Sequence, residues 1–258
     1  MKKRIYQILQ AVFVPKCSLC FRKRLYDSRL CSFCMEHLEL YDLSSSKIQL
    51  DKLAFPCYSL GPMHFLSRPI IHRLKYKKQS FWTSELLKIP RVQQLLNEIK
   101  LEIDLLHSKN KEIELCLIPV PLHSIRLRER GYNQAEKIAE VFSEVLQIPM
   151  NKQLLMRSRN NASQTKMNIL QRQKNSKELF VLRYSKAENQ SKYHCILIDD
   201  VLTTGATLLA CSRALEIGGH QVISSLTLLR ADLESENDFI IEQNMEKWTI
   251  GESWKERL

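Results

Sequence analysis

The stretch that decides the fold is CILIDDVLTTGAT, residues 195–207. Its first four residues are apolar and predict a short buried strand at 195–198. Two carboxylates, Asp199 and Asp200, follow at the carboxyl end of that strand, where open α/β sheets bind their ligands. A turn of small residues then leads into a helix predicted over 206–217 and closed by two glycines. This order predicts a phosphate-binding turn within an α/β domain.

The residues of the turn have the chemistry that a ribose 5-phosphate group requires. Backbone amides at the start of a helix lack partners, and the helix dipole favours an anion there. Glycine lets the backbone close around a phosphate, threonine hydroxyls add donors, and the aspartates accept from the ribose diol or act through Mg²⁺. The alternative is that the acids and threonines only cap the turn and the helix. The candidate ligand residues are Asp199, Asp200, Thr203, Thr204, Gly205, Ala206 and Thr207.

The flanking segments supply the rest of an α/β domain. Strands that alternate with amphipathic helices predict a parallel sheet with right-handed crossovers. Polar residues dominate 157–178, which predicts a long mobile loop. Strands are expected at 54–60, 114–120 and 222–229, and helices at 67–75, at 83–107 with a break at Pro90, and at 133–147.

Four cysteines near the N-terminus follow the pattern C-x2-C-x10-C-x2-C. Each C-x2-C places two thiolates on one turn, and two such turns complete a tetrahedral zinc site. The alternatives are a redox pair or free thiols. A site closed by four cysteines leaves no open position, so the expected zinc is structural. Its predicted ligands are Cys17, Cys20, Cys31 and Cys34, whereas the other four cysteines lie in apolar runs and are expected to be buried.

Two basic segments are candidates for anion binding. Arg126, Arg128 and Arg130 precede Gly131, and guanidinium groups bind pyrophosphate oxygens in bidentate fashion. Gly131 argues that this loop is not a regular helix, and a solvated basic turn is the alternative.

The second basic segment mixes lysines with aromatic rings, as proteins that bind single-stranded nucleic acid do. The alternative is that the rings belong to the core and the lysines to a solvated face. The segment contains Lys75, Tyr76, Lys77 and Lys78, followed by Phe81 and Trp82.

The net charge of +11 is unevenly distributed along the 258 residues. Residues 231–258 contain eight acidic and three basic residues, so the first 230 residues carry +16. A basic body suits a phosphate-rich ligand, including nucleic acid, and a solubilising surface is the alternative. No apolar run approaches the roughly 20 residues that a membrane span needs, which excludes an integral membrane protein of the helical class.

Three regions are expected along the chain. Residues 1–42 contain an amphipathic helix and the cysteine module, 54–230 form the α/β domain, and 231–258 form an acidic tail. Polar residues interrupt the N-terminal helix and no small-residue cleavage site follows, so it is not interpreted as a secretory signal. A cytoplasmic protein is therefore expected.

Residues 195–207 resemble the phosphoribosyl pyrophosphate signature of the type I phosphoribosyltransferases. Joined to an N-terminal zinc module, they make the chain similar to the ComF family (also called GntX-like), which is known for natural competence and the use of external DNA. The segments 72–77 and 119–134 resemble further motifs of that family, and Gln164, Thr165, Arg172, Asn175 and Phe180 fall at the spacing of its loop motif. The resemblance spans about residues 12–230. It departs from the family at Phe21, at Met167 and in the tail, which has no counterpart.

The resemblance implies a type I phosphoribosyltransferase-like sheet, a mobile loop over the site and Mg-pyrophosphate bound near the end of the first strand. The implied pyrophosphate and loop residues are Pro121, Leu122, Arg126, Arg130, Asn133, Gln134, Gln164 and Arg172. The implied function is a competence protein that binds phosphoribosyl pyrophosphate, contacts single-stranded DNA and acts with the uptake machinery at the inner face of the membrane. The alternative is an active phosphoribosyltransferase that acts on an unidentified base or amine, unrelated to DNA.

Overall fold

The computed structural model describes nine stretches of the chain, which include the four clustered cysteines and residues 195–207. The expected helix at 1–14, most of the expected loop at 157–178 and the tail from 232 onward lie outside the described residues. Four candidate contacts also lie outside them: Lys77, Lys78, Gln164 and Arg172. The described residues are 15–20, 22–24, 29–38, 43–63, 67–76, 81–108, 112–158, 179–183 and 192–231.

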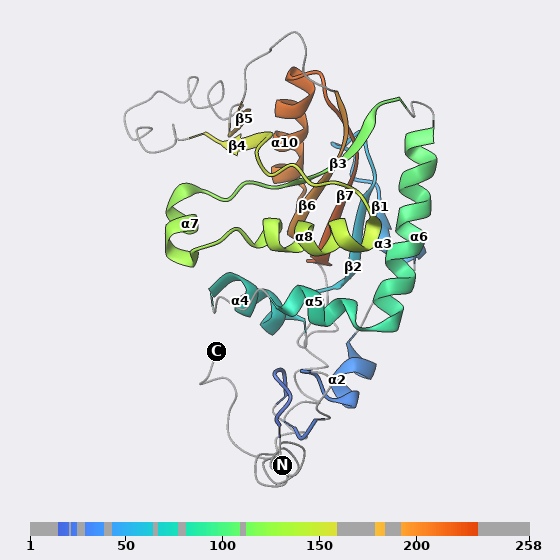
Figure 1. Ribbon diagram of the computed structural model, residues 1–258, viewed down its shortest axis with the longest axis vertical. Coiled ribbons are helices and arrows are strands. Elements are labelled where there is room, and N and C mark those ends of the chain that lie inside the picture. Colours follow the sequence, from blue (N-terminus) through green and yellow to red (C-terminus); the bar gives the residue numbers. More distant parts are fainter. Residues whose placement is uncertain are drawn as a thin grey trace, which may run out of the picture.

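A five-stranded sheet forms the centre of the fold, with the strand order β1-β2-β7-β6-β3 (Figure 1). The neighbours from β2 to β3 run parallel, and the short β1 pairs antiparallel with β2 at one edge. The predicted α/β fold with a parallel sheet is therefore confirmed. The strands are β1 (Lys47–Ile48), β2 (Cys57–Pro62), β3 (Glu114–Pro119), β6 (Tyr193–Leu202) and β7 (Gln221–Arg230).

The helices lie close to the bounds that the sequence indicates. The expected break is present, because Pro90 begins a new helix, where its missing N–H costs nothing. Within the described residues, no helix has the length and apolarity that crossing a bilayer requires. The helices are α2 (Ser32–His37), α3 (Leu43–Ser46), α4 (Arg68–Tyr76), α5 (Trp82–Leu87), α6 (Pro90–His107), α7 (Ser124–Arg130), α8 (Gln134–Leu146) and α10 (Ala206–Ile217), and a hairpin comprises β4 (Leu155–Arg157) and β5 (Phe180–Leu182).

The alternating side chains of β6 divide the core into two layers. Ile196 and Ile198 belong to one buried cluster, and Cys195 and Leu197 belong to the other. The first cluster includes α4, α5, α6, α8 and the cysteine module, whereas the second includes α10 and the β4–β5 hairpin. The sheet is thus covered on both faces, as parallel sheets are. All four isolated cysteines lie in these strands and helices and are buried, as predicted.

Two local features differ from the sequence-based expectation. The apolar run ends at Ile198, but β6 continues to Leu202, because Asp199 still pairs across the sheet with Thr227 of β7. Asp199 and Asp200 are therefore fixed within the strand itself. This rigid backbone determines where their carboxylates lie.

The second difference is α7, which forms where the sequence argues for an irregular loop. The Nδ1 atom of His123 accepts a hydrogen bond of 3.2 Å from the backbone N–H of Ile125 and caps the start of this helix. Gly131 then takes a φ of 79°, which ends the helix. Glycine adopts this conformation without strain, so it favours the end of a helix here. The expectation of irregular backbone is wrong at this point.

Candidate functional site

Asp199 and Asp200 lie at the edge of the sheet where β3, β6 and β7 end. The backbone N–H of Val120 donates to the carbonyl oxygen of Ile198 (2.9 Å), so the chain that leaves β3 passes directly beside the acid pair. Pro121 and Leu122 follow there and are partly buried. The sequence-based candidates from these two segments are therefore neighbours in space.

Asp200 is buried, with 5% of its surface exposed, but it faces polar groups. Its Oδ2 atom lies 3.0 Å from Nζ of Lys75 and accepts a hydrogen bond of 3.2 Å from Nε2 of Gln134. These partners come from α4 and from the first residue of α8. Three segments that are remote in the sequence therefore meet at one carboxylate oxygen.

Asn133 fixes the position of Gln134. Its Oδ1 atom accepts from the backbone N–H of Ala135 (3.1 Å) and caps α8, and its Nδ2 atom donates to the carbonyl of Val120 (3.0 Å). This tie holds the start of α8 against the end of β3. Within the described part of the chain, the buried Oε1 atom of Gln134 makes no hydrogen bond, which leaves one acceptor beside the acids.

Asp199 has an unusual protonation equilibrium. Burial and the neighbouring charge of Asp200 raise its pKa to about 7, against an ordinary value of 3.8. A hydrogen bond of 2.8 Å from the backbone N–H of Asp200 to Oδ1 of Asp199 opposes that rise. The carboxyl group therefore changes its charge close to neutral pH.

The turn after β6 is open to solvent at its threonines. Thr203, Thr204 and Thr207 are exposed, and Gly205 is buried beneath them. Gly205 is the residue that precedes α10, with a φ of 70° and no side chain to cap the helix. The alternative in which a threonine or aspartate caps α10 is therefore wrong, and an anion can approach the first amides of the helix.

The two predicted arginines of α7 differ in their surroundings. Arg126 is exposed, whereas Arg130 is buried. Arg157, on β4, lies near Arg126: burial and the charge of Arg126 both lower the pKa of the Arg157 guanidinium. The guanidinium of Arg157 also lies 5.4 Å from the ring centroid of Phe180. Two cations that approach each other in this way favour an anion between them.

Arg157 also lies near α10. Cys211, on α10, interacts with the charges of both Asp199 and Arg157. The sequence offers no signal for this arginine, because the β4–β5 hairpin brings it to α10 through tertiary contacts.

The basic segment around Lys75 is only partly described. Lys75 contacts Asp200, as above, and the side chain of Tyr76 lies outside the described residues. Trp82 is fully buried and stacks on Phe81, with 5.5 Å between their ring centroids. The alternative interpretation of Trp82 as a core residue is therefore confirmed.

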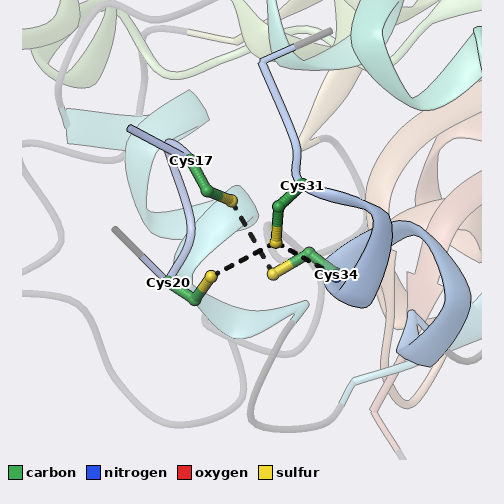
Figure 2. Close-up of side chains that lie close together, drawn as sticks. All are labelled: Cys17, Cys20, Cys31 and Cys34. Atoms are coloured by element: carbon green, nitrogen blue, oxygen red, sulfur yellow. Dashed lines mark hydrogen bonds between the residues drawn. The ribbon is translucent and has the colours of Figure 1, made fainter. Parts of the chain in front are cut away.

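The four N-terminal cysteines form a second site, where their side chains point toward one another (Figure 2). Their four sulfur atoms lie within 4.8 Å of one another; Cys17 and Cys34 are 3.7 Å apart, and Cys20 and Cys31 are 3.5 Å apart. A tetrahedral zinc with Zn–S bonds of about 2.3 Å requires sulfur–sulfur distances of about 3.8 Å. Both the donor chemistry and the spacing therefore suit one metal ion.

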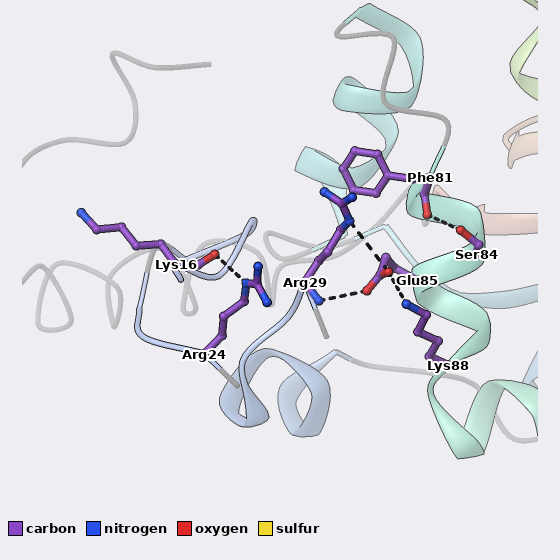
Figure 3. A network of polar contacts seen from close by, with 7 residues as sticks. All are labelled: Lys16, Arg24, Arg29, Phe81, Ser84, Glu85 and Lys88. Atoms are coloured by element: carbon purple, nitrogen blue, oxygen red, sulfur yellow. Dashed lines mark hydrogen bonds and ion pairs between the residues drawn. The ribbon is translucent and has the colours of Figure 1, made fainter. Parts of the chain in front are cut away.

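Glu85 of α5 joins the cysteine module to the helices beside the sheet (Figure 3). One of its oxygens accepts a hydrogen bond of 3.0 Å from the backbone N–H of Arg29, and the other accepts from Nζ of Lys88 (2.6 Å). Burial alone would raise the pKa of Glu85, but the hydrogen bonds from Lys88 and Arg29 hold it below its ordinary value. The guanidinium of Arg29 also lies 4.1 Å from the ring centroid of Phe81.

Comparison with known proteins gives a consistent result. The model of the phosphoribosyl transferase domain matches residues 127–257. The chain is 29% identical to Competence protein F of Haemophilus influenzae over 221 residues, which are 83% of this chain and 90% of that protein. It is 24% identical to DNA utilization protein YhgH of Escherichia coli K12 over 222 residues, 83% of this chain and 89% of that protein.

A third relative is similar over a shorter region. Competence protein ComFC of Bacillus subtilis is 34% identical over 140 residues, which are 54% of each chain. These similarities confirm the resemblance that the motifs indicate.

Proposed function

This chain belongs to the phosphoribosyltransferase domain family, and from that premise we propose that it binds phosphoribosyl pyrophosphate and serves the uptake and use of external DNA. The observation that carries the proposal is the exposed, uncapped turn that joins the acid pair of β6 to α10. A 5-phosphate would lie on the amides of residues 204–207, and the ribose diol would face Asp199 and Asp200.

The rest of the ligand would lie toward the arginines. Mg-pyrophosphate would contact the end of β3 at Pro121 and Leu122 and the neighbouring guanidinium groups of Arg126 and Arg157. Gln134 and Asn133 would hold the acids and the end of β3 in place. Mg²⁺ would arrive with the ligand, because pyrophosphate oxygens and carboxylates are the ligands it prefers.

Titration with phosphoribosyl pyrophosphate and Mg²⁺ tests this proposal. The unaltered protein should bind, and the double variant Asp199→Ala/Asp200→Ala should lose binding. Asp104→Ala is the matched control, because Asp104 forms an exposed ion pair with Lys100 on α6. Binding that survives in the double variant would place the ligand elsewhere.

The cysteine cluster is proposed to hold one structural zinc ion. Four thiolates at tetrahedral spacing favour zinc, and four protein ligands leave no open position for catalysis. Elemental analysis of the purified chain should find one zinc atom per molecule. A folded protein that contains no zinc would refute the assignment.

Single-stranded DNA is the proposed macromolecular partner. The relatives named for competence and DNA utilization support it, as does the charge of +16 over the first 230 residues. The exposed Lys23 of the cysteine module and Arg128 of α7 are suitable phosphate contacts.

Gel shifts with single-stranded DNA at several salt concentrations test this part. Replacement of Lys23 and Arg128 by serine should weaken binding and make it less dependent on salt, because each lost phosphate contact lowers the slope by about 0.7. Lys137→Ser is the control, since Lys137 is paired with Glu140 on α8. The absence of any shift at low salt would remove the DNA proposal and leave the ligand proposal intact.

Phosphoribosyl transfer is a second candidate, and the pKa of Asp199 near 7 favours it. An acceptor nitrogen would bond to C1 of the ribose, the bond from C1 to pyrophosphate would break, and the proton of the acceptor would pass to Asp199. Pyrophosphate release over a panel of bases and amines tests for turnover. Release with one acceptor that Asp199→Asn abolishes would establish an enzyme.

A further inference from the structure

Lys75 contacts an acidic group, although the basic segment around it in the sequence suggests a nucleic-acid surface. Its Nζ atom lies 3.0 Å from Oδ2 of Asp200, and its side chain is 25% exposed. The backbone that carries it is fixed: Leu74 is fully buried, and its carbonyl accepts a hydrogen bond from the hydroxyl of Tyr132. Lys75 is therefore anchored at the base of its side chain and tied at its tip.

The charges around Lys75 explain why it lies there. Asp199 and Asp200 place two acidic groups at the end of one strand, and the charge of Lys75 acts to lower the pKa of Asp199. Gln134 contacts the same oxygen of Asp200 but carries no charge. Among the described residues, Lys75 is the cation in direct contact with the acid pair.

The covalent structure of phosphoribosyl pyrophosphate indicates that Lys75 would contact the substituent at C1. In phosphoribosyl pyrophosphate, C1 carries the pyrophosphate and is bonded to C2, whose hydroxyl belongs to the diol. A cation that touches the acid facing the diol would therefore lie close to the C1 substituent. The ammonium of lysine is a compact charge on a flexible four-carbon stem, so it can move that far.

We propose that Lys75 is a positioning and specificity residue of the ligand site: it neutralises Asp200 in the free protein and contacts the C1 pyrophosphate in the complex. This inference rests on the proposed function, because it takes the ribose to be held by the acid pair. It assigns Lys75 to the sugar-phosphate site instead of to a nucleic-acid surface. It also makes Lys75 one of the residues that distinguish phosphoribosyl pyrophosphate from ribose 5-phosphate.

Titration of Lys75→Met with both ligands, in the presence of Mg²⁺, tests the inference. Affinity for phosphoribosyl pyrophosphate should fall by about tenfold or more, because this is the usual loss when a charge-assisted hydrogen bond is removed. Affinity for ribose 5-phosphate, which has no pyrophosphate, should change by less than about threefold. Lys75→Arg should recover part of the loss, because it restores the charge. Lys137→Met is the matched control for removal of an ion-paired lysine.

The outcomes separate this inference from the proposed function. If the unaltered protein binds neither ligand, the proposed function fails first. If Lys75→Met weakens both ligands equally, Lys75 only braces Asp200 and the inference is overturned. The inference is also overturned if neither affinity changes. A loss confined to single-stranded DNA binding would assign Lys75 to the nucleic-acid surface. Thermal melts of both variants show whether each remains folded.

Discussion

Arg73 of α4 donates a hydrogen bond from Nη1 to the backbone carbonyl of Ser18, which lies between two cysteines of the N-terminal cluster. Two residues later on the same helix, Lys75 contacts Asp200. Helix α4 therefore touches both candidate sites, and in Figure 1 it lies between the cysteine module and the ends of the central strands. A change at the cysteine cluster has a direct structural route to the acid pair.

Removal of the proposed zinc should therefore weaken ligand binding without any change at the acid pair. Cys34→Ser should lose the metal, release Ser18 from Arg73 and lower the affinity for phosphoribosyl pyrophosphate several-fold, on the order of 1 kcal/mol. Elemental analysis and calorimetric titration measure the two effects together. Arg73→Met should keep the zinc and still weaken binding, whereas Arg91→Met, at an exposed position of α6, should change neither. An unchanged affinity in a folded, zinc-free protein would show that α4 does not couple the sites.

Glu85 should stabilise the junction between the cysteine module and α5 in a pH-dependent way. Its pKa lies below the ordinary value of 4.5, so its contribution is complete above pH 4.5 and is lost as the pH falls through the folded-state pKa. Glu85→Gln should lower the free energy of unfolding at pH 7 by about 1–3 kcal/mol, because Arg29 and Lys88 lose a charged partner. Chemical denaturation at pH 7 and pH 4 measures both effects. Glu144→Gln, on the exposed face of α8, is the control, and an equal loss in the two variants would contradict the prediction.

Asp199 should make ligand binding depend on pH near neutrality. With a pKa of about 7, its ionised fraction rises about tenfold between pH 6 and pH 8, and affinity for phosphoribosyl pyrophosphate should rise with it. Titrations at the two pH values measure this change, and Asp199→Asn should keep only the smaller pH dependence that comes from the phosphate groups of the ligand.

The raised pKa of Asp199 has the opposite effect on folding stability, which should fall as the pH rises. Because the folded state favours the protonated acid, the contribution of Asp199 is complete below pH 3.8 and is lost as the pH rises through 7. Asp199→Asn should therefore be more stable than the unaltered protein at pH 8. Asp51→Asn, at an exposed position, is the control and should have the same stability at pH 8 as the unaltered protein.

Gly205→Ala should disturb the turn through two separable effects. A φ of +70° costs an alanine about 1 kcal/mol, and its Cβ would lie 2.6 Å from Cδ1 of Leu50. Thermal melts should show a loss of stability, and titration should show weaker ligand binding. Gly219→Ala has a similar φ of +82° but its nearest contact is 3.9 Å away, so it should show the strain alone. If the two variants lose the same stability, the contact with Leu50 contributes nothing.

Local patterns in the sequence were sufficient for the sheet class and for both candidate sites. A strand, two acids, a small-residue turn and a helix are neighbours along the chain, so residues 195–207 identify the turn without knowledge of the rest. The cysteine quartet has the same property, because each pair lies on one turn and its spacing alone indicates a metal site. The turn and each cysteine pair depend on contacts between residues that are close in sequence.

The partners of these sites were decided only by the tertiary structure. Lys75 reaches Asp200, Arg157 approaches Arg126 and Arg73 contacts Ser18 because helices and strands from distant parts of the chain pack against one another. Hydrophobic periodicity shows which face of a helix is buried, but it does not show which charged group that face will meet. The sequence by itself therefore determined the turn, the cysteine cluster and the parallel sheet, and packing determined which cations face the acids.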